Sequence, residues 1–108
     1  MRFIRVLTIA MIATVAGCAT VDITKTGKGT YPETVADDID VLMTRPERRY
    51  EELGTVAVRG WSTNDTAKMH NAMRTKAAPL GANAVILTDT GVDYNGYYWA
   101  NGVAVRWK

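Results

Sequence analysis

Four short stretches after residue 38 carry the apolar patterning of β-strands. They are Ile39–Met43, Tyr50–Trp61, Ala84–Thr88 and Val103–Trp107. Val56 and Val58 alternate with polar residues, which predicts that one face of the second strand is buried. Gly54 interrupts that strand early, and a glycine inside a strand is typical of a bulge or bend. The third stretch is almost wholly apolar, which predicts a strand in the middle of a sheet.

Between residues 62 and 80 the apolar residues recur every three or four positions, as they do on one face of a helix. This stripe consists of Met69, Ala72, Met73, Ala77 and Leu80. Ser62–Asn64 are candidate N-caps, and Asp65 suits the positive end of the helix. The helix is predicted to end at about Leu80 with Gly81 as its cap, and Pro79 is expected to kink the last turn.

The predicted order is strand, strand, helix, strand, strand. This order indicates an α+β domain, with one helix packed on one face of a four-stranded, mostly antiparallel sheet. A parallel arrangement of the two strands that flank the helix stays open. The position of the last reversal also stays open. Asp93–Gly96 suits a hairpin turn, whereas Asn101–Gly102 is either the true reversal or a bulge within a long final strand.

The first 17 residues have the pattern of an export signal. Arg2 and Arg5 precede the apolar stretch Val6–Ala16, which is shorter than the roughly 20 residues of a membrane-spanning helix. Val15–Cys18 resembles a bacterial lipobox, which implies cleavage between Gly17 and Cys18 and attachment of diacylglycerol and palmitate to Cys18. The alternative is a conventional signal cleaved near Ala16 or Ala19, which leaves Cys18 as a thiol or removes it.

The lipobox implies three regions: a lipoprotein signal peptide at 1–17, a lipidated tether at 18–33 and a folded domain at 34–108. Val21 and Ile23 alternate with polar residues, so a short edge strand is the alternative to part of the tether. Ala19 follows the cysteine in place of aspartate, which by resemblance to Gram-negative sorting patterns favours the outer membrane, with the domain facing the periplasm. Two or three acyl chains anchor a protein stably.

The cysteine count and the net charge restrict how the domain can fold and what it can bind. Cys18 is the single cysteine, so the domain is predicted to fold without a disulfide. Loss of Arg2 and Arg5 with the leader removes the net charge of +2, and a formally neutral domain gives no electrostatic argument for nucleic acid as a partner.

Tyr50–Gly54 and Met73–Ile86 resemble segments of small bacterial envelope proteins related to the RcsF stress-sensor lipoprotein and to YbjQ-type domains. In those proteins a Leu-Gly strand precedes a helix that ends in a Leu-Gly-Ala turn before a buried strand, so the resemblance implies the same α+β architecture over residues 35–108. The sensor's structural disulfides and the metal ligands associated with YbjQ-type domains have no counterparts here.

No residue pattern predicts catalysis, a metal site or a cofactor other than the covalent lipid. His70 is the only histidine, and its position beside the apolar stripe predicts a boundary or solvent-facing residue. Glu51 and Glu52 are adjacent and point to opposite faces of a strand. Asp37, Asp38 and Asp40 fit no known calcium-loop spacing.

Two groups are candidate partner surfaces. Large amphipathic residues gather late in the chain, and they are Tyr94, Tyr97, Tyr98, Trp99 and Trp107. Core filling is the favoured alternative for them, because the only phenylalanine is Phe3 in the leader. Arg45, Arg48 and Arg49 form a basic loop suited to lipid head groups or a partner's carboxylates, with an ordinary exposed loop as the favoured alternative.

These observations predict a non-catalytic outer-membrane lipoprotein that binds or senses another envelope component. The alternative is a self-assembling, ring-like domain that binds a small ligand; the sequence does not decide its oligomeric state.

Overall fold

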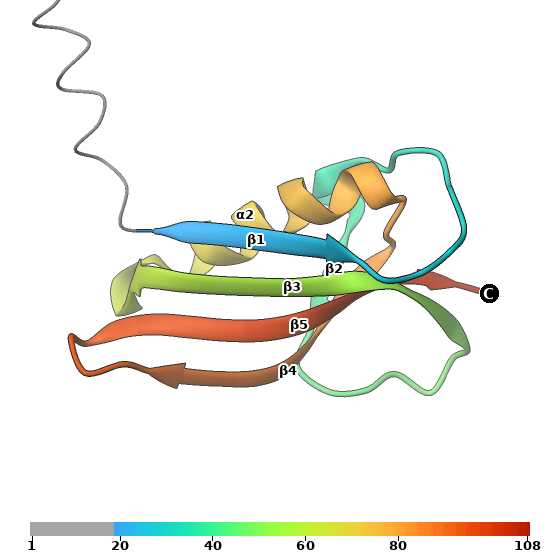
Figure 1. The fold of residues 1–108 in the computed structure, drawn as a ribbon. Coiled ribbons are helices and arrows are strands. Elements are labelled where there is room, and N and C mark those ends of the chain that lie inside the picture. Colours follow the sequence, from blue (N-terminus) through green and yellow to red (C-terminus); the bar gives the residue numbers. More distant parts are fainter. Residues whose placement is uncertain (1–18) are drawn as a thin grey trace, which may run out of the picture.

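A computed structural model describes residues 19–108, and the predicted cleavage site at Gly17 and Cys18 lies outside this range. The described chain forms an α+β domain in which one helix packs on a five-stranded mixed sheet (Figure 1). Its principal elements are β1 (Thr20–Lys25), β2 (Asp40–Leu42), β3 (Tyr50–Ser62), α2 (Thr66–Ala77), β4 (Ala84–Val92) and β5 (Tyr97–Trp107). Three short 3₁₀ turns join them, η1 (Ala36–Asp38), η2 (Thr63–Asp65) and η3 (Ala78–Leu80).

The strand order across the sheet is β1-β3-β5-β4-β2. The prediction of four strands is wrong, because residues 20–25, predicted as part of a tether, form a fifth strand. β1 pairs antiparallel with β3 from Thr20 opposite Arg59 to Lys25 opposite Gly54. Val21 and Ile23 pack against the core, which confirms the edge-strand alternative.

The parallel pair is formed by β2 and β4. The strands that flank the helix, β3 and β4, are not neighbours, because β5 pairs with both of them. A hairpin places β5 beside β4. Because β5 also pairs with β3 along most of its length, it lies between β3 and β4.

The reversal before the last strand lies at Asp93–Gly96, and Asn101–Gly102 lies inside β5. The last strand therefore begins at Tyr97, six residues before its predicted start at Val103. The irregularity predicted near Gly54 is confirmed by a register shift between Glu52 and Gly54.

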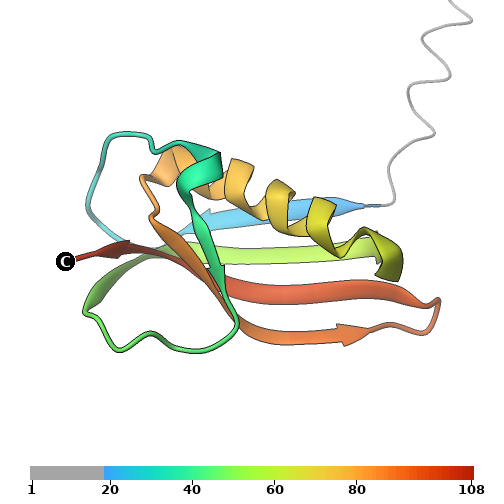
Figure 2. The same ribbon diagram turned by 180° about the vertical axis from the view of Figure 1, so that it is seen from behind.

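The helix lies on one face of the sheet, as seen from behind in Figure 2, and three of the five residues of the predicted stripe are fully buried there. Ala72 is half-buried, and Leu80 lies beyond the helix in η3. Met69, Met73 and Ala77 have no exposed surface, and they pack against Val56, Val58 and other core residues of the strands. The α-helix ends at Ala77 and not at Leu80, because Pro79 lies in the 3₁₀ turn η3, which lacks a regular helical ladder. Gly81 caps this turn as predicted.

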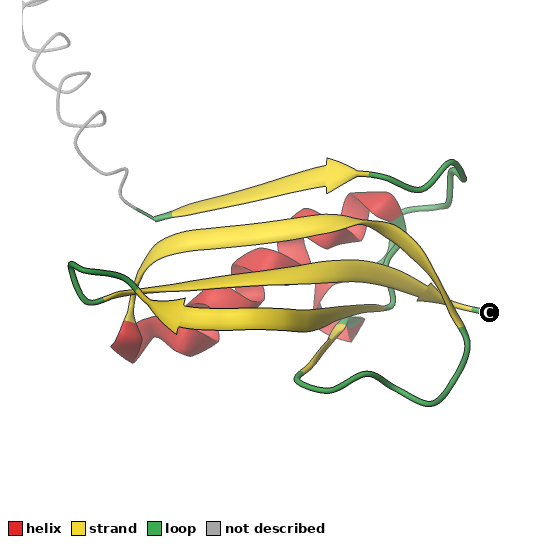
Figure 3. Ribbon diagram, turned by 60° about the horizontal axis from the view of Figure 1, so that its bottom comes forward, coloured by secondary structure: helices red, strands yellow, loops and turns green. Residues whose placement is uncertain are grey.

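The opposite face of the sheet is covered only in part. Ala84, Ile86 and Val105 form a second buried cluster, against which Leu42, Tyr50, Val103 and Trp107 pack. The 43–49 loop joins β2 to β3 near the end of the sheet where the chain ends (Figure 3). This loop and the second cluster border two hollows on this face of the sheet.

Candidate functional site

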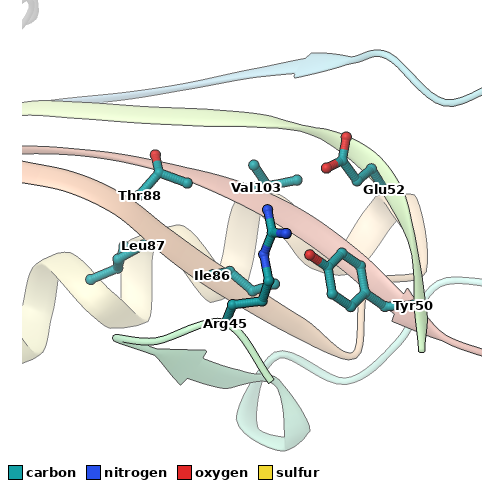
Figure 4. A pocket seen from close by; sticks show the side chains of 7 residues that line it. All are labelled: Arg45, Tyr50, Glu52, Ile86, Leu87, Thr88 and Val103. Carbon is teal, nitrogen blue, oxygen red and sulfur yellow. The ribbon is translucent and has the colours of Figure 1, made fainter. Parts of the chain in front are cut away.

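A groove opens between the 43–49 loop and the uncovered face of the sheet (Figure 4). Its volume is about 240 Å³. Ile86 and Val103 provide an apolar floor, and Arg45, Tyr50 and Glu52 bring a guanidinium, a phenol and a carboxylate to its wall. Leu87 and Thr88 complete the lining.

A second hollow of about 370 Å³ adjoins the groove at the outer edge of β4. It is lined by Met43 and the segment 87–90 of β4. β2 pairs with β4 only from Ala84 to Ile86, so within the described residues 19–108 the rest of β4 has no neighbouring strand on that side. Unpaired strand edges present backbone donors and acceptors to another chain.

The basic loop is exposed and close to the groove. Arg45 lines the groove itself, and the Arg48 guanidinium lies 4.3 Å from the ring centroid of Trp107. The Arg49 carbonyl accepts a hydrogen bond from the Lys108 N–H at 3.1 Å, which ties the loop to the chain's end. We call this region, with the start of β3 and the end of β5, the loop end of the sheet.

The loop end is held by contacts from the segment before β2. The Tyr31 hydroxyl donates a hydrogen bond of 2.6 Å to Glu51, and the acceptance of that bond by the carboxylate raises the pKa of Tyr31. Arg106 lies over the Tyr31 ring at 4.8 Å and donates to the Gly81 carbonyl at 2.9 Å. Glu51 bonds Tyr31 while Glu52 lines the groove, in keeping with the prediction that they point to opposite faces.

The predicted aromatic group does not form a single surface. Tyr98 packs against the main core, and Trp99 lies against Gly91 on the neighbouring strand. Tyr94 and Tyr97 are exposed at the β4–β5 turn. We call this region, with the start of β1 and the end of β3, the hairpin end of the sheet.

The two candidate surfaces therefore lie at opposite ends. Tyr97 and Trp107 bound β5, and ten strand steps between them span about 34 Å. Trp107 contacts Arg48 at the loop end. The arginines and the exposed tyrosines cannot contact one small partner together.

His70 is half-buried on α2, as its position beside the stripe predicted. Its Nε2 atom is buried without a hydrogen-bond partner within the described structure. Desolvation lowers the pKa of His70, and the positive charge of Arg74 lowers it further.

Asp37, Asp38 and Asp40 are exposed. Among residues 19–108 there is no group of three or more His, Cys, Asp or Glu side chains placed to hold a metal ion. None of the helices in that part of the chain is long and apolar enough to cross a membrane.

Sequence reasoning did not find the groove or the open edge of β4. Both arise because β2 is only three residues long while β4 runs for nine. The polar run Thr88–Thr90, directly after a buried segment, is the one local signal that β4 continues beyond the core.

Comparison with known proteins supports the fold. The crystal structure of a Francisella virulence factor, FvfA, in an orthorhombic form is similar with a TM-score of 0.56, over 80% of this chain and 96% of that chain. The sequences are 14% identical, so the similarity concerns the fold alone. No family model matches the chain, and no curated protein matches it. The resemblance to RcsF and YbjQ-type domains stays a prediction.

Proposed function

We propose that this protein is a non-catalytic lipoprotein, anchored through Cys18 in the outer membrane, that binds an extended segment of another envelope protein in the groove and along the open edge of β4. The observation that carries the proposal is the continuity of the groove with the open edge of β4. Leu87 and Thr88 line both hollows, so one extended segment can follow the edge and reach Arg45.

Openness favours a peptide over an enclosed small molecule. Small-molecule sites usually enclose about 300–1,000 Å³ and bury most of the ligand. The groove of about 240 Å³ and the hollow of about 370 Å³ are both open to solvent, so they suit the side chains of an extended segment. Addition of a strand to the edge of β4 supplies main-chain hydrogen bonds, and the groove selects the side chains, as in known modes of peptide recognition.

Charge indicates the kind of segment. Arg45 lines the groove, Arg48 and Arg49 are exposed on the same loop, and arginine binds carboxylates with two parallel hydrogen bonds. Glu52 lines the groove from the sheet. A partner segment with an acidic residue near Arg45 and an apolar one over Ile86 fits this pattern.

Orientation is consistent with a partner in the periplasm. β1 begins at Thr20, two residues after Cys18, at the hairpin end. The groove lies farther along the sheet, since its lining residue Val103 is level with Thr24, four strand residues or about 13 Å from the start of β1. An anchor at Cys18 thus holds the arginines away from the membrane that carries the lipid and favours carboxylates over head groups as their ligands.

The test combines two measurements on the full chain in its native host. Mass spectrometry is expected to find cleavage before Cys18 and acyl chains on it. A photo-crosslinking residue at Thr88 is expected to capture one discrete partner, whereas the same residue at Lys68 on the exposed face of α2 captures none. Arg45→Glu is expected to reduce the Thr88 adduct several-fold.

Equal labelling from Thr88 and Lys68, or an Arg45→Glu variant that crosslinks as well as the parent, would contradict the proposed binding site. An unmodified Cys18 would contradict the anchor.

Ring-like self-assembly is the second candidate. It is favoured by the two open edges, since β1 lies at one margin of the sheet and the outer part of β4 is unpaired at the other. Joining β1 of one copy to β4 of the next would repeat head to tail. A discrete oligomer in solution, lost when a proline replaces Thr90, would support this candidate over the first.

A further inference from the structure

The turn between β4 and β5 concentrates exposed apolar surface. Among residues 19–108, five large hydrophobic side chains are strongly exposed, and three of them lie within six residues of one another. Tyr94 is fully exposed, Val92 is 58% exposed and Tyr97 is 42% exposed. Clustered exposed apolar residues mark an interaction surface more often than scattered ones do.

Hydrogen bonds hold the turn that carries these side chains at the tip of the hairpin. The Asp93 carboxylate accepts hydrogen bonds from the backbone N–H groups of Asn95 at 2.9 Å and Tyr97 at 3.0 Å. The backbone of Asp93 also bonds Tyr97 and Gly96 across the turn. Because these bonds fix the backbone, little conformational entropy opposes insertion of the exposed rings into another phase.

The start of β1 lies at the same end of the sheet as this turn (Figure 1). Thr20 pairs with Arg59, and Tyr97 pairs with Ser62, three residues farther along β3. Three strand residues span about 10 Å. The turn therefore projects beyond the first residue of β1.

Chain length sets how far Cys18 can lie from this turn along the sheet. Cys18 is two residues from Thr20, and two residues span at most about 7 Å. With the strands upright on the membrane, a lipid on Cys18 brings the turn to the membrane surface or slightly beneath it.

We infer that the tip of the β4–β5 hairpin, through Tyr94, Tyr97 and Val92, docks into the lipid surface beside the anchor and holds the domain upright. The inference rests on the proposed lipid anchor at Cys18. Tyrosine favours the boundary between head groups and acyl chains, where its ring is buried and its hydroxyl stays wet. Residues 92–98 contain Asp93 and no lysine or arginine, so the lipid surface is recognised by apolar and aromatic contact and not by its charge.

The experiment uses the full-length lipidated protein in vesicles of phosphatidylethanolamine and phosphatidylcholine. Cys18 is the only cysteine and its sulfur is blocked by lipid, so an introduced cysteine is the single free thiol. Asn95→Cys carries an environment-sensitive fluorophore at the tip and leaves Tyr94, Tyr97 and Val92 in place. Met43→Cys is the matched control, because Met43 is 62% exposed at the loop end.

Nitroxide-labelled lipids are expected to quench the probe at position 95 several-fold more than the probe at position 43, and added salt is expected to leave this difference unchanged. In a second series with the probe at position 95, Tyr94→Ser combined with Tyr97→Ser is expected to abolish most of the quenching while the protein stays folded and lipidated.

Equal weak quenching at positions 95 and 43, in protein whose Cys18 lipid is verified by mass, overturns the docking and leaves the anchor standing. Quenching that disappears at high salt, or persists without the two tyrosines, also overturns it. An unmodified Cys18 overturns the proposed anchor and the inference with it.

Discussion

The two ends of the sheet differ in how their exposed chemistry is held. At the loop end, Tyr31, Arg106 and Gly81 are joined by a cation–π contact and hydrogen bonds, and the arginine loop is tied to Trp107 and Lys108. At the hairpin end, Tyr94 and Val92 are exposed at a turn that is held by the backbone and carboxylate of Asp93, and the residues of β5 that follow pair with the end of β3. Packing accounts for Tyr31, Arg106 and Trp107 at the first end, whereas Tyr94 at the second end is fully exposed within residues 19–108.

The largest expected difference in stability is between alanine substitutions at two glycines with the same φ. Gly81 and Gly96 both have a φ of 84°. A Cβ on Gly81 would lie 2.7 Å from the Tyr31 Cβ and 2.8 Å from the Pro32 carbonyl oxygen, whereas a Cβ on Gly96 would meet nothing within 4 Å. We expect Gly96→Ala to cost about 1 kcal/mol, which is the cost of left-handed backbone alone.

Gly81→Ala adds a steric collision and is expected to cost about 3 kcal/mol. Urea unfolding of both variants measures the difference. Similar costs would mean that the loop end is no more tightly packed than the hairpin end.

A smaller effect is expected within the arginine loop. Arg48 stacks on Trp107 and Arg49 does not, so Arg48→Ala is expected to destabilise the domain by about 0.5 kcal/mol more than Arg49→Ala. The measurement is thermal unfolding of the two variants side by side. Both variants lose one positive charge, so the effect of that loss on stability cancels in the comparison. An equal loss of stability in both variants would mean that the stacking of Arg48 on Trp107 does not stabilise the domain.

Tyr31→Phe removes the hydrogen bond to Glu51 and is expected to lower the urea midpoint modestly. Since this bond raises the pKa of Tyr31, its stabilisation is present below the ordinary tyrosine pKa of 10.0 and is lost as pH rises through the raised value. The difference between parent and variant should therefore shrink at alkaline pH. A difference that is constant from pH 8 to alkaline conditions contradicts this assignment.

The smallest predicted effect involves His70, between the two ends. Because its pKa is lowered in the folded state, the neutral ring contributes stability above the ordinary pKa of 6.5, and this contribution is lost as pH falls through the lowered value. His70→Gln is expected to weaken the loss of stability on acidification. Urea midpoints at pH 7.5 and 5.5 measure this, and parallel losses in parent and variant would assign the acid sensitivity to the carboxylates.

Part of the candidate site was predictable. The sequence predicted exposed arginines, because they lie in a polar loop between two strands. That the aromatic residues do not form a single surface became clear only from the face of the sheet on which each side chain of β5 lies. Tyr98 and Tyr97 are neighbours in sequence, yet one packs on the core and the other is exposed, because successive residues of a strand point to opposite faces. A shift of one residue in the predicted start of β5 would exchange their roles.

By itself the sequence determined the elements whose signals are local. The stripe of Met69, Met73 and Ala77, the Gly81 cap and the bulge near Gly54 follow from side-chain period and backbone preference. Tertiary structure alone decided that residues 20–25 join the sheet, that β5 separates β3 from β4, and that β2 pairs with only the first three of the nine residues of β4. Six residues of alternating polarity suit a coil or an edge strand equally well, and only the long-range hydrogen bonds of β3 favour the strand.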